Sequence, residues 1–299
     1  STGFKITVDD GDVNSNNEAH IFVAIRRSDG YVGKPVETGT SVFNMVMGTS
    51  NSDVPAFVSG FVTDFAFNRR PATSENWWTQ SRLTGDKYVV LNNTDAESTS
   101  SSNEWDYNNG WYSATSDQSA YQAWSWKRHA GFDVVTYKGD GVNGRSLAHS
   151  MNDVPEMMIV KRRSSTEDWT VYHTGLTSVN YHLTLNSTGA EVDMSSSTEK
   201  VWKSAPISTH FEIGSHDRVN TDGQTYLALL FSSISGISKV GSYNGSNSSQ
   251  TITTGFQPRF VIIKCTTDSN DWYVLDTTRG WASGNDPNLR LNSNVAQNS

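Results

Sequence analysis

The chain has 299 residues, a formal net charge of -8 and a single cysteine, Cys265. Its longest run of basic residues covers 161–163, which argues against nucleic-acid binding because neutralising phosphates requires a basic face. One cysteine excludes an internal disulfide framework, and no apolar run approaches the ~18 residues of a membrane-spanning helix. We therefore expect no nucleic acid and no membrane insertion, and we expect Cys265, in an apolar run, to be a packed core thiol.

Strand-like runs follow one another along the chain, separated by Gly, Asn, Asp and Ser. No segment carries an apolar stripe of helical period over three turns. The predicted fold class is all-β, built from tandem antiparallel β-sandwich repeats of roughly 100 residues, with a jelly-roll as one option for their connectivity. In chain order, the clearest strand-like runs cover residues 21–25, 156–162, 168–173, 181–186, 211–215 and 225–232.

Three stretches of the chain share one pattern of residues. The run GFVTDFAFNRR from Gly60 aligns with GFQPRFVIIKC from Gly255, and VPEMMIVKRR from Val154 aligns with QPRFVIIKCT from Gln257. In each copy a basic residue is followed at one fixed interval by a tryptophan, and later by a Leu-Asn pair. Because these intervals agree, we expect structural repeat positions at Trp77, Trp169, Trp272, Asn92, Asn186 and Asn292, after the basic residues Arg69, Lys161 and Lys264.

The two ends of the chain look like complementary halves of one unit. Residues 21–25 (IFVAI) align with 226–230 (YLALL) at the close of the complete unit, whereas the last unit has only an opening half. Either the chain is a window of a longer array, or residues 1–27 complete the last unit of the same chain or of a neighbouring subunit. Serial units would form a rod. The predicted segments are 1–35 (a closing half and a linker), 36–131 (a divergent unit), 132–235 (a complete unit) and 236–299 (an opening half).

The complete unit carries a family resemblance. Residues 131–176, followed by LTLNSTGAE at 183–191 and RVNTDGQTYLALLF at 218–231, resemble a repeat domain of virion structural proteins from tailed bacteriophages, above all marine and cyanobacterial ones. The resemblance implies a non-enzymatic component of the virion surface, such as a tail fibre or appendage for host attachment. It implies other virion proteins as partners, a homo-oligomer such as a trimer or ring, and no cofactor. The alternatives are a capsid or baseplate decoration protein and a polysaccharide-degrading tail spike.

Aromatic residues that do not repeat are the candidates for recognition. Their position in the divergent unit, above all between 98 and 131, suits the binding of a host cell-envelope glycan, and packing of loops or subunits is the competing interpretation. The repeated tryptophans, at a strand start in every copy, are expected to be core anchors instead. The candidate ligand-binding residues are Trp105, Trp111, Tyr112, Trp124 and Trp126, with Trp78 and Tyr107 of the same unit and Trp281 of the last unit as further candidates.

Metal and catalytic signals are weak. Asp10, Asp12 and Asn14 fit positions of a calcium loop, but Ser15 and Ile21 stand where such a loop requires Gly and Glu. None of the seven histidines forms an HxH or HExxH motif, so no metal site is predicted. A glycosidase needs two carboxyls in one cleft, whereas the main candidates fall in hairpins, where a turn role is simpler. These carboxylates are Asp106, Asp168, Asp271 and Asp276.

Overall fold

The computed structural model describes residues 3–7, 12–26, 38–50, 54–113, 117–128, 130–151, 153–281 and 286–298. Its strands all pair antiparallel, so the expectation of an all-β fold is confirmed. In these ranges no helix is long and apolar enough to cross a membrane. The helices are short: α1 (Gly39–Val42), α2 (Asp217–Asn220) and the 3₁₀ turn η1 (Arg82–Thr84).

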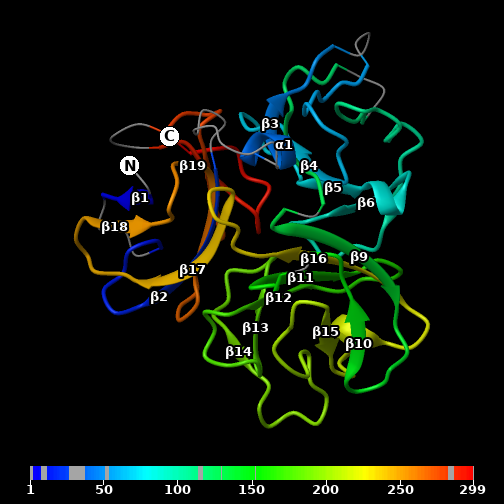
Figure 1. Ribbon diagram of the computed structural model, residues 1–299, viewed down its shortest axis with the longest axis vertical. Helices are drawn as coiled ribbons and strands as arrows, with labels where there is room; N and C mark the ends of the chain where they lie inside the picture. The colour runs from blue at the N-terminus through cyan, green and yellow to red at the C-terminus, as the bar shows by residue number, and fades with distance from the viewer. Residues whose placement is uncertain are drawn as a thin grey trace.

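Three large sheets form three lobes around a common centre (Figure 1). The first sheet has the order β3 (Phe43–Met47), β8 (Gln122–Trp126), β4 (Phe65–Arg69), β5 (Trp78–Ser81), β6 (Lys87–Val90), β7 (Ser98–Thr99). The second has the order β9 (Phe132–Lys138), β16 (Thr225–Phe231), β11 (Met157–Arg162), β12 (Trp169–His173), β13 (Tyr181–Thr184), β14 (Val192–Asp193). The third has the order β17 (Ser238–Asn244), β2 (Ala19–Arg26), β19 (Pro258–Cys265), β20 (Tyr273–Asp276), β21 (Asn288–Arg290).

Strand β2, although it comes from the N-terminal part of the chain, lies inside the third sheet, between β17 and β19. Of the arrangements that the sequence leaves open, the structure therefore shows the one in which an N-terminal strand completes the last sheet of the same chain. Lys264 pairs with Ile21 in the third sheet, and Lys161 pairs with Leu227 in the second. Residues 21–25 thus correspond to 227–231, and the expected alignment with 226–230 is wrong by one residue. The register follows the inward-facing side chains, because a shift of one residue turns every side chain to the other face.

One apolar core is shared by all three sheets. It contains Phe67 and Trp124 from the first sheet, Ile159 from the second, and Phe260 and Ile262 from the third, all nearly inaccessible to solvent. The rod of serial, independent sandwiches expected from the sequence is therefore not found. Strands such as β11 are apolar on both faces, so each sheet needs a partner on both sides, and the inner partners here are the other two sheets.

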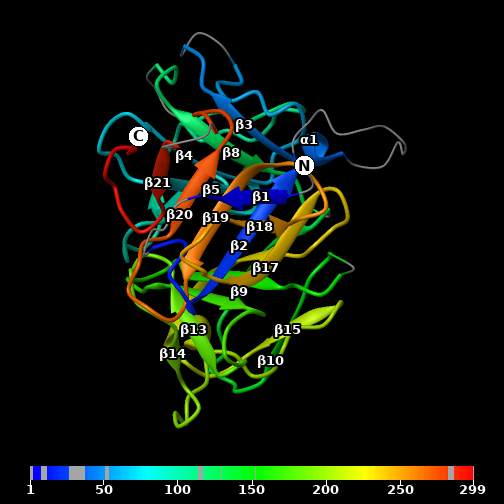
Figure 2. The ribbon, with the colours of Figure 1, turned by 90° about the vertical axis from the view of Figure 1, so that its left-hand side faces the viewer.

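The outer face of each sheet is covered by its own second layer. The pair β10 (Arg145–Ala148) and β15 (His210–Ile213) packs on the second sheet, and the pair β1 (Gly3–Ile6) and β18 (Gln250–Thr253) packs on the third. Figure 2 shows β1 and β18 lying across β2, β17 and β19. Over the first sheet the cover is a loop cluster that includes Phe57, Trp105 and Trp111. Each lobe is thus a two-layer unit with one face in the common core.

The repeated tryptophans join neighbouring sheets. Each is fully buried, and each donates its indole N–H to a backbone carbonyl oxygen of the next sheet. Each sheet therefore donates one such bond to one neighbour and accepts one from the other. The bonds run from Trp77 to Arg290 (2.8 Å), from Trp169 to Val90 (3.0 Å) and from Trp272 to Thr184 (3.1 Å).

The repeated basic residues and asparagines support the same junctions. The side chains of Arg69, Lys161 and Lys264 are fully buried and donate to the backbone carbonyls of Val295, Thr94 and Thr188, in the loops that follow β21, β6 and β13 of the neighbouring sheet. Burial lowers the pKa of Lys161 to about 8 and that of Arg69 to about 10. The side-chain oxygens of Asn92, Asn186 and Asn292 accept hydrogen bonds from the backbone N–H groups of Trp77, Trp169 and Trp272.

Candidate functional site

A cavity of about 260 Å³ lies between the outer face of the first sheet and the segment that covers it. This covering segment consists of residues 98–113 and 117–121. Because side chains alternate along a strand and Phe65 and Phe67 point into the common core, Asn68 on β4 points outward. From the sheet, the cavity is lined by Asn68, Trp78, Gln80 and Tyr88. From the covering segment, it is lined by Ser100, Asn103, Ser113, Gln118 and Tyr121.

Two carboxamides occupy the floor of this pocket where the other sheets have apolar side chains. Asn68 corresponds by strand register to Val160 in the second sheet and to Ile263 in the third. Gln80 corresponds in the same way to Tyr172 and Leu275. Apolar side chains at these positions would pack the outer layer without the free-energy cost of burying polar groups. The presence of two carboxamides here therefore needs a reason other than packing.

The pocket lining holds an unused acceptor on its floor and an unused donor on the covering segment. Gln80 Nε2 donates to Asn68 Oδ1 at 3.0 Å, while Gln80 Oε1 is buried without a partner among the described residues. Asn103 Oδ1 accepts from the Ser113 hydroxyl at 3.0 Å, while Asn103 Nδ2 is likewise buried without a partner in the described part of the chain. Unmatched buried polar groups cost free energy, which a ligand with hydroxyl groups would recover because a hydroxyl both donates and accepts.

Half-buried aromatic rings form the rim. Trp78 and Tyr88 meet edge to face with ring centroids 5.3 Å apart, and Trp78 Nε1 donates to Glu75 Oε1 at 3.0 Å. Tyr121 carries the Arg70 guanidinium over its ring at 4.7 Å, and burial raises the pKa of this phenol. The rim thus presents aromatic faces above a polar floor, so this pocket is more polar than most small-ligand pockets, which are lined mainly by apolar side chains.

Four of the expected ligand-binding residues are core residues. The exposed fractions of Trp105, Trp111, Trp124 and Trp126 are 5%, 0%, 0% and 2%, so these rings offer no face to a ligand, and that expectation is wrong for them. Trp124 and Trp126 fill the common core, and Trp105 stacks on Trp111 in the outer layer. The half-buried Tyr112 packs against that outer cluster.

The further aromatic candidates lie in different places. Trp78 lines the pocket, Trp281 packs against the outer cluster of the third sheet, and Tyr107 donates to Glu104 Oε2 at 2.8 Å. This hydrogen bond raises the pKa of Tyr107 to about 12. The buried tryptophans still bear on the pocket, since Trp105 Nε1 bonds the carbonyl of Gly85 and so fixes the covering segment to the sheet.

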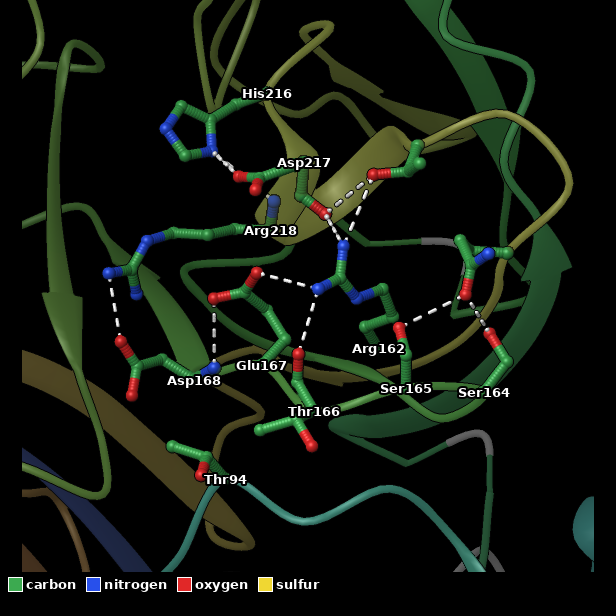
Figure 3. A network of polar contacts seen from close by, with 12 residues as sticks. Thr94, Arg162, Ser164, Ser165, Thr166, Glu167, Asp168, His216, Asp217 and Arg218 are labelled. Atoms are coloured by element: carbon green, nitrogen blue, oxygen red, sulfur yellow. Dashed lines mark hydrogen bonds and ion pairs between the residues drawn. The ribbon is translucent and has the colours of Figure 1, made fainter.

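The carboxylates considered for hydrolysis are engaged elsewhere. Figure 3 shows Asp168 in an ion pair with Arg218 at 2.8 Å, beside a second pair between Glu167 and Arg162 at 3.0 Å. Asp168 also accepts from Asn186 Nδ2 at 2.8 Å. The third sheet repeats this arrangement, because Asp271 pairs with Arg290 at 3.0 Å and accepts from Asn292 at 2.7 Å. Asp276 forms a buried ion pair with Arg279, Asp106 is exposed, and the described pocket lining contains no carboxylate.

The expected metal signals map onto one corner of the third sheet. Asp10 of the candidate calcium loop lies outside the described residues, Asp12 accepts a hydrogen bond from Tyr273, and the buried Asn14 donates to the carbonyl of Ser248 at 3.0 Å. Cys265 is a buried thiol, as expected, and donates to Glu18 at 3.0 Å. The structure also brings Glu18, His20 and Cys265 together as a group of side chains that could bind a metal ion. No sequence motif indicates this group.

The protein is thus an all-β domain built around three large sheets, with a polar pocket on the outer face of one of them. Residues 79–299, well over half of the chain, match the family described as a domain of unknown function, DUF7483, and the chain belongs to that family. No curated protein matches the chain, and no solved structure does. The matched region contains Gln80, Tyr88 and the whole segment that covers the pocket, whereas Asn68 and Trp78 precede it.

Proposed function

We propose that this protein is a non-enzymatic structural component of a bacteriophage virion, a tail-fibre or appendage protein, and that the pocket of its first sheet binds a glycan of the host cell envelope. The virion role is supported by the resemblance of residues 131–231 to phage repeat domains. The binding role is carried by one observation, the replacement of outer-layer apolar residues by Asn68 and Gln80 under a cavity.

The chemistry of the pocket favours an uncharged sugar. Its described lining consists of amides, hydroxyls and aromatic rings and includes no charged side chain. At about 260 Å³ the cavity is smaller than typical drug-sized pockets, which run from roughly 300 to 1,000 Å³, so it suits one small ring rather than a long ligand. Trp78, Tyr88 and Tyr121 would stack on the apolar face of that ring, while Gln80 and Asn103 would bond its hydroxyls.

The alternative as a polysaccharide-degrading spike is less well supported. Hydrolysis of a glycosidic bond generally uses two carboxyl groups about 5 to 10 Å apart, one of them a proton donor. Asp168, Asp271 and Asp276 are each paired with an arginine away from this pocket. Binding without reaction is therefore the function that the arrangement of groups favours.

The decisive variant converts the pocket floor into that of the other sheets. The double substitution Asn68→Val and Gln80→Leu places there the residues found at Val160 and Leu275. Wild-type protein should bind neutral bacterial envelope polysaccharides on a glycan array and compete with phage adsorption, and the double variant should lose at least about tenfold in affinity, which corresponds to 1.4 kcal/mol. Asn109→Ser, an exposed amide of the same segment outside the lining, is the matched control.

Three results would count against the proposal in different ways. Equal binding by wild-type protein and the Asn68→Val/Gln80→Leu variant would show that the pocket is not the binding site. Wild-type protein that binds no envelope glycan and leaves adsorption unchanged, yet binds purified capsid or baseplate, would establish the decoration alternative. Loss of polymer viscosity during the binding assay would instead support the spike.

A further inference from the structure

The outer face of the third sheet brings together three residues from opposite ends of the chain. His20 on β2 pairs directly with Cys265 on β19, so the two side chains leave the sheet on the same face. Glu18 lies just before β2, and its Oε2 accepts a hydrogen bond from Cys265 Sγ, so its carboxylate reaches the same face. His20 and Cys265 are buried, and Glu18 is half-buried at the margin of the group.

The donor atoms of this group are close enough to share an ion. One ligand atom from each of Glu18, His20 and Cys265 lies within 4.8 Å of the other two, and Cys265 Sγ is 3.0 Å from Glu18 Oε2. Ligand atoms of a tetrahedral zinc site are about 3.3 to 3.8 Å apart, given Zn–S of about 2.3 Å and Zn–N or Zn–O of about 2.0 Å. Side-chain movements of about 1 Å would complete that geometry.

His20 is oriented in the manner of a metal ligand. Its Nδ1 is 3.2 Å from the backbone carbonyl oxygen of Glu18, and the backbone of Asp12 also interacts with the ring, while its buried Nε2 makes no close hydrogen bond among the described residues. The ring stacks on Tyr243 with centroids 5.1 Å apart and planes 11° from parallel. Metal-bound histidines usually have one ring nitrogen held by a carbonyl or carboxylate while the other binds the ion. A fully buried imidazole nitrogen without a close hydrogen bond is otherwise costly.

We propose that Glu18, His20 and Cys265 form a binding site for a single Zn²⁺ ion, which joins the N-terminal strand to the C-terminal sheet. Thiolate, imidazole and carboxylate together are a typical zinc ligand set, and hard cations such as Ca²⁺ would not favour the sulfur. Water supplies the fourth ligand on the side of half-buried Glu18. The site lies on a different sheet from the glycan pocket and does not depend on the proposed function.

The ion would act as a cross-link between distant parts of the chain. Glu18 and Cys265 are 247 positions apart in sequence, and β2 is otherwise held to β19 by backbone pairing and apolar packing. A ligand that binds only the folded state stabilises it by an amount that rises with the logarithm of the ratio of its free concentration to its Kd. Zinc should therefore raise the thermal midpoint of the whole chain.

Cobalt and zinc titrations of the purified, metal-stripped full chain provide the test. Wild-type protein should bind one equivalent of Co²⁺ with a thiolate-to-cobalt charge-transfer band, Zn²⁺ should displace it, and Zn²⁺ should raise the unfolding midpoint. Cys265→Ser should abolish the band and weaken Zn²⁺ binding at least about tenfold while the circular dichroism spectrum is unchanged. Glu18→Gln, at the half-buried margin of the group, provides a second variant should Cys265→Ser misfold.

A half-buried histidine far from this group provides the control. His210→Gln, on strand β15 in the layer that covers the second sheet, should bind Co²⁺ and Zn²⁺ as wild type does. The absence of a thiolate-to-cobalt band at one equivalent in wild-type protein would overturn the proposal. So would undiminished Zn²⁺ affinity in Cys265→Ser, because the ion would then be held by groups elsewhere.

Discussion

Trp169 Nε1 lies 3.0 Å from the carbonyl oxygen of Val90, so a fully buried ring of the second sheet is bonded to the backbone of the first. Lys161, whose ammonium group also lies near this ring, donates to the carbonyl of Thr94 at 2.8 Å across the same junction. The junction therefore combines a large apolar ring with two directional bonds. That combination fixes the angle between two sheets, which apolar packing alone would leave adjustable.

Trp169→Phe should destabilise the protein more than the same change at Trp78. The substitution removes the hydrogen bond, leaves the Val90 carbonyl buried without its partner and creates a small cavity, for a loss of about 2 to 4 kcal/mol. Trp78 is half-buried at the pocket rim, and Trp78→Phe should cost less than about 1 kcal/mol. Guanidinium denaturation measures both free energies of unfolding, and equal losses would contradict the role given to the junction.

His173 should make the protein sensitive to acid. Its ring is 1% exposed and its Nδ1 accepts a hydrogen bond from the backbone N–H of Gly175 at 2.8 Å. Burial lowers the pKa of His173 to about 3 from an ordinary value of 6.5, so the unfolded state binds the proton first. Stability from this residue is complete above pH 6.5 and is lost as pH falls toward 3, by up to roughly 4 kcal/mol.

His173→Asn should flatten that part of the pH profile, because the amide oxygen can accept the bond from Gly175 without titrating. The free energy of unfolding would be measured by urea denaturation from pH 7 to pH 3.5. The half-buried His210, whose Nδ1 lies 3.1 Å from the Thr209 hydroxyl, provides the control, and His210→Asn should follow the wild-type curve. A wild-type slope that persists in His173→Asn would show that other groups cause the acid sensitivity.

Removing the pocket floor should stabilise the protein. Asn68→Val with Gln80→Leu replaces both partners of a buried hydrogen bond and removes the unsatisfied Gln80 oxygen, so the free energy of unfolding should rise by about 1 to 2 kcal/mol. Gln80→Leu alone should gain less, since it leaves Asn68 Oδ1 without this donor. Thermal and urea unfolding provide the measurement, and a double variant less stable than either single variant would argue for a structural role of the amides.

Asp276 should be among the least tolerant carboxylates of the chain. It is fully buried, pairs with Arg279 at 2.8 Å and accepts hydrogen bonds from Gln122 and Trp124 of the first sheet, both at 3.2 Å. Asp276→Ala leaves the Arg279 charge buried and unpaired, at a cost of about 3 to 5 kcal/mol. The exposed Asp106 provides the comparison, and Asp106→Ala should stay within about 0.5 kcal/mol of wild type. Similar effects of the two changes in chemical denaturation would refute this assignment.

Much of the architecture can be predicted from the sequence, because the tryptophans, basic residues and asparagines that join neighbouring sheets recur at fixed intervals. Trp77, Trp169 and Trp272 could be aligned from spacing alone, and the structure gives all three the same kind of bond. Spacing does not say what an apolar face packs against. Ile159 and Val160 indicate a strand that is buried on both faces, but not whether its neighbour is a second layer of its own unit or another sheet.

The pocket lies in the divergent unit, where the sequence also concentrates its non-repeating aromatic residues. Most of those rings nevertheless fill cores, because large aromatic residues are commonly buried. The available signal was the residue before each repeated cation, which is Val160 and Ile263 in two copies but Asn68 in the other. Glu18, His20 and Cys265 could not be found by local motifs, since their proximity depends on the register between β2 and β19.

The position of β2 also affects how the chain is made. A ribosome releases this strand long before β17 and β19, so the nascent chain carries an apolar strand without its native partners until late in synthesis. An unpaired apolar strand can pair with the corresponding strands of a second copy of the chain, which is the exchange known as domain swapping. The third sheet can close only after β19 has been synthesised, so β2 must wait for strands that lie more than 200 residues further along the chain.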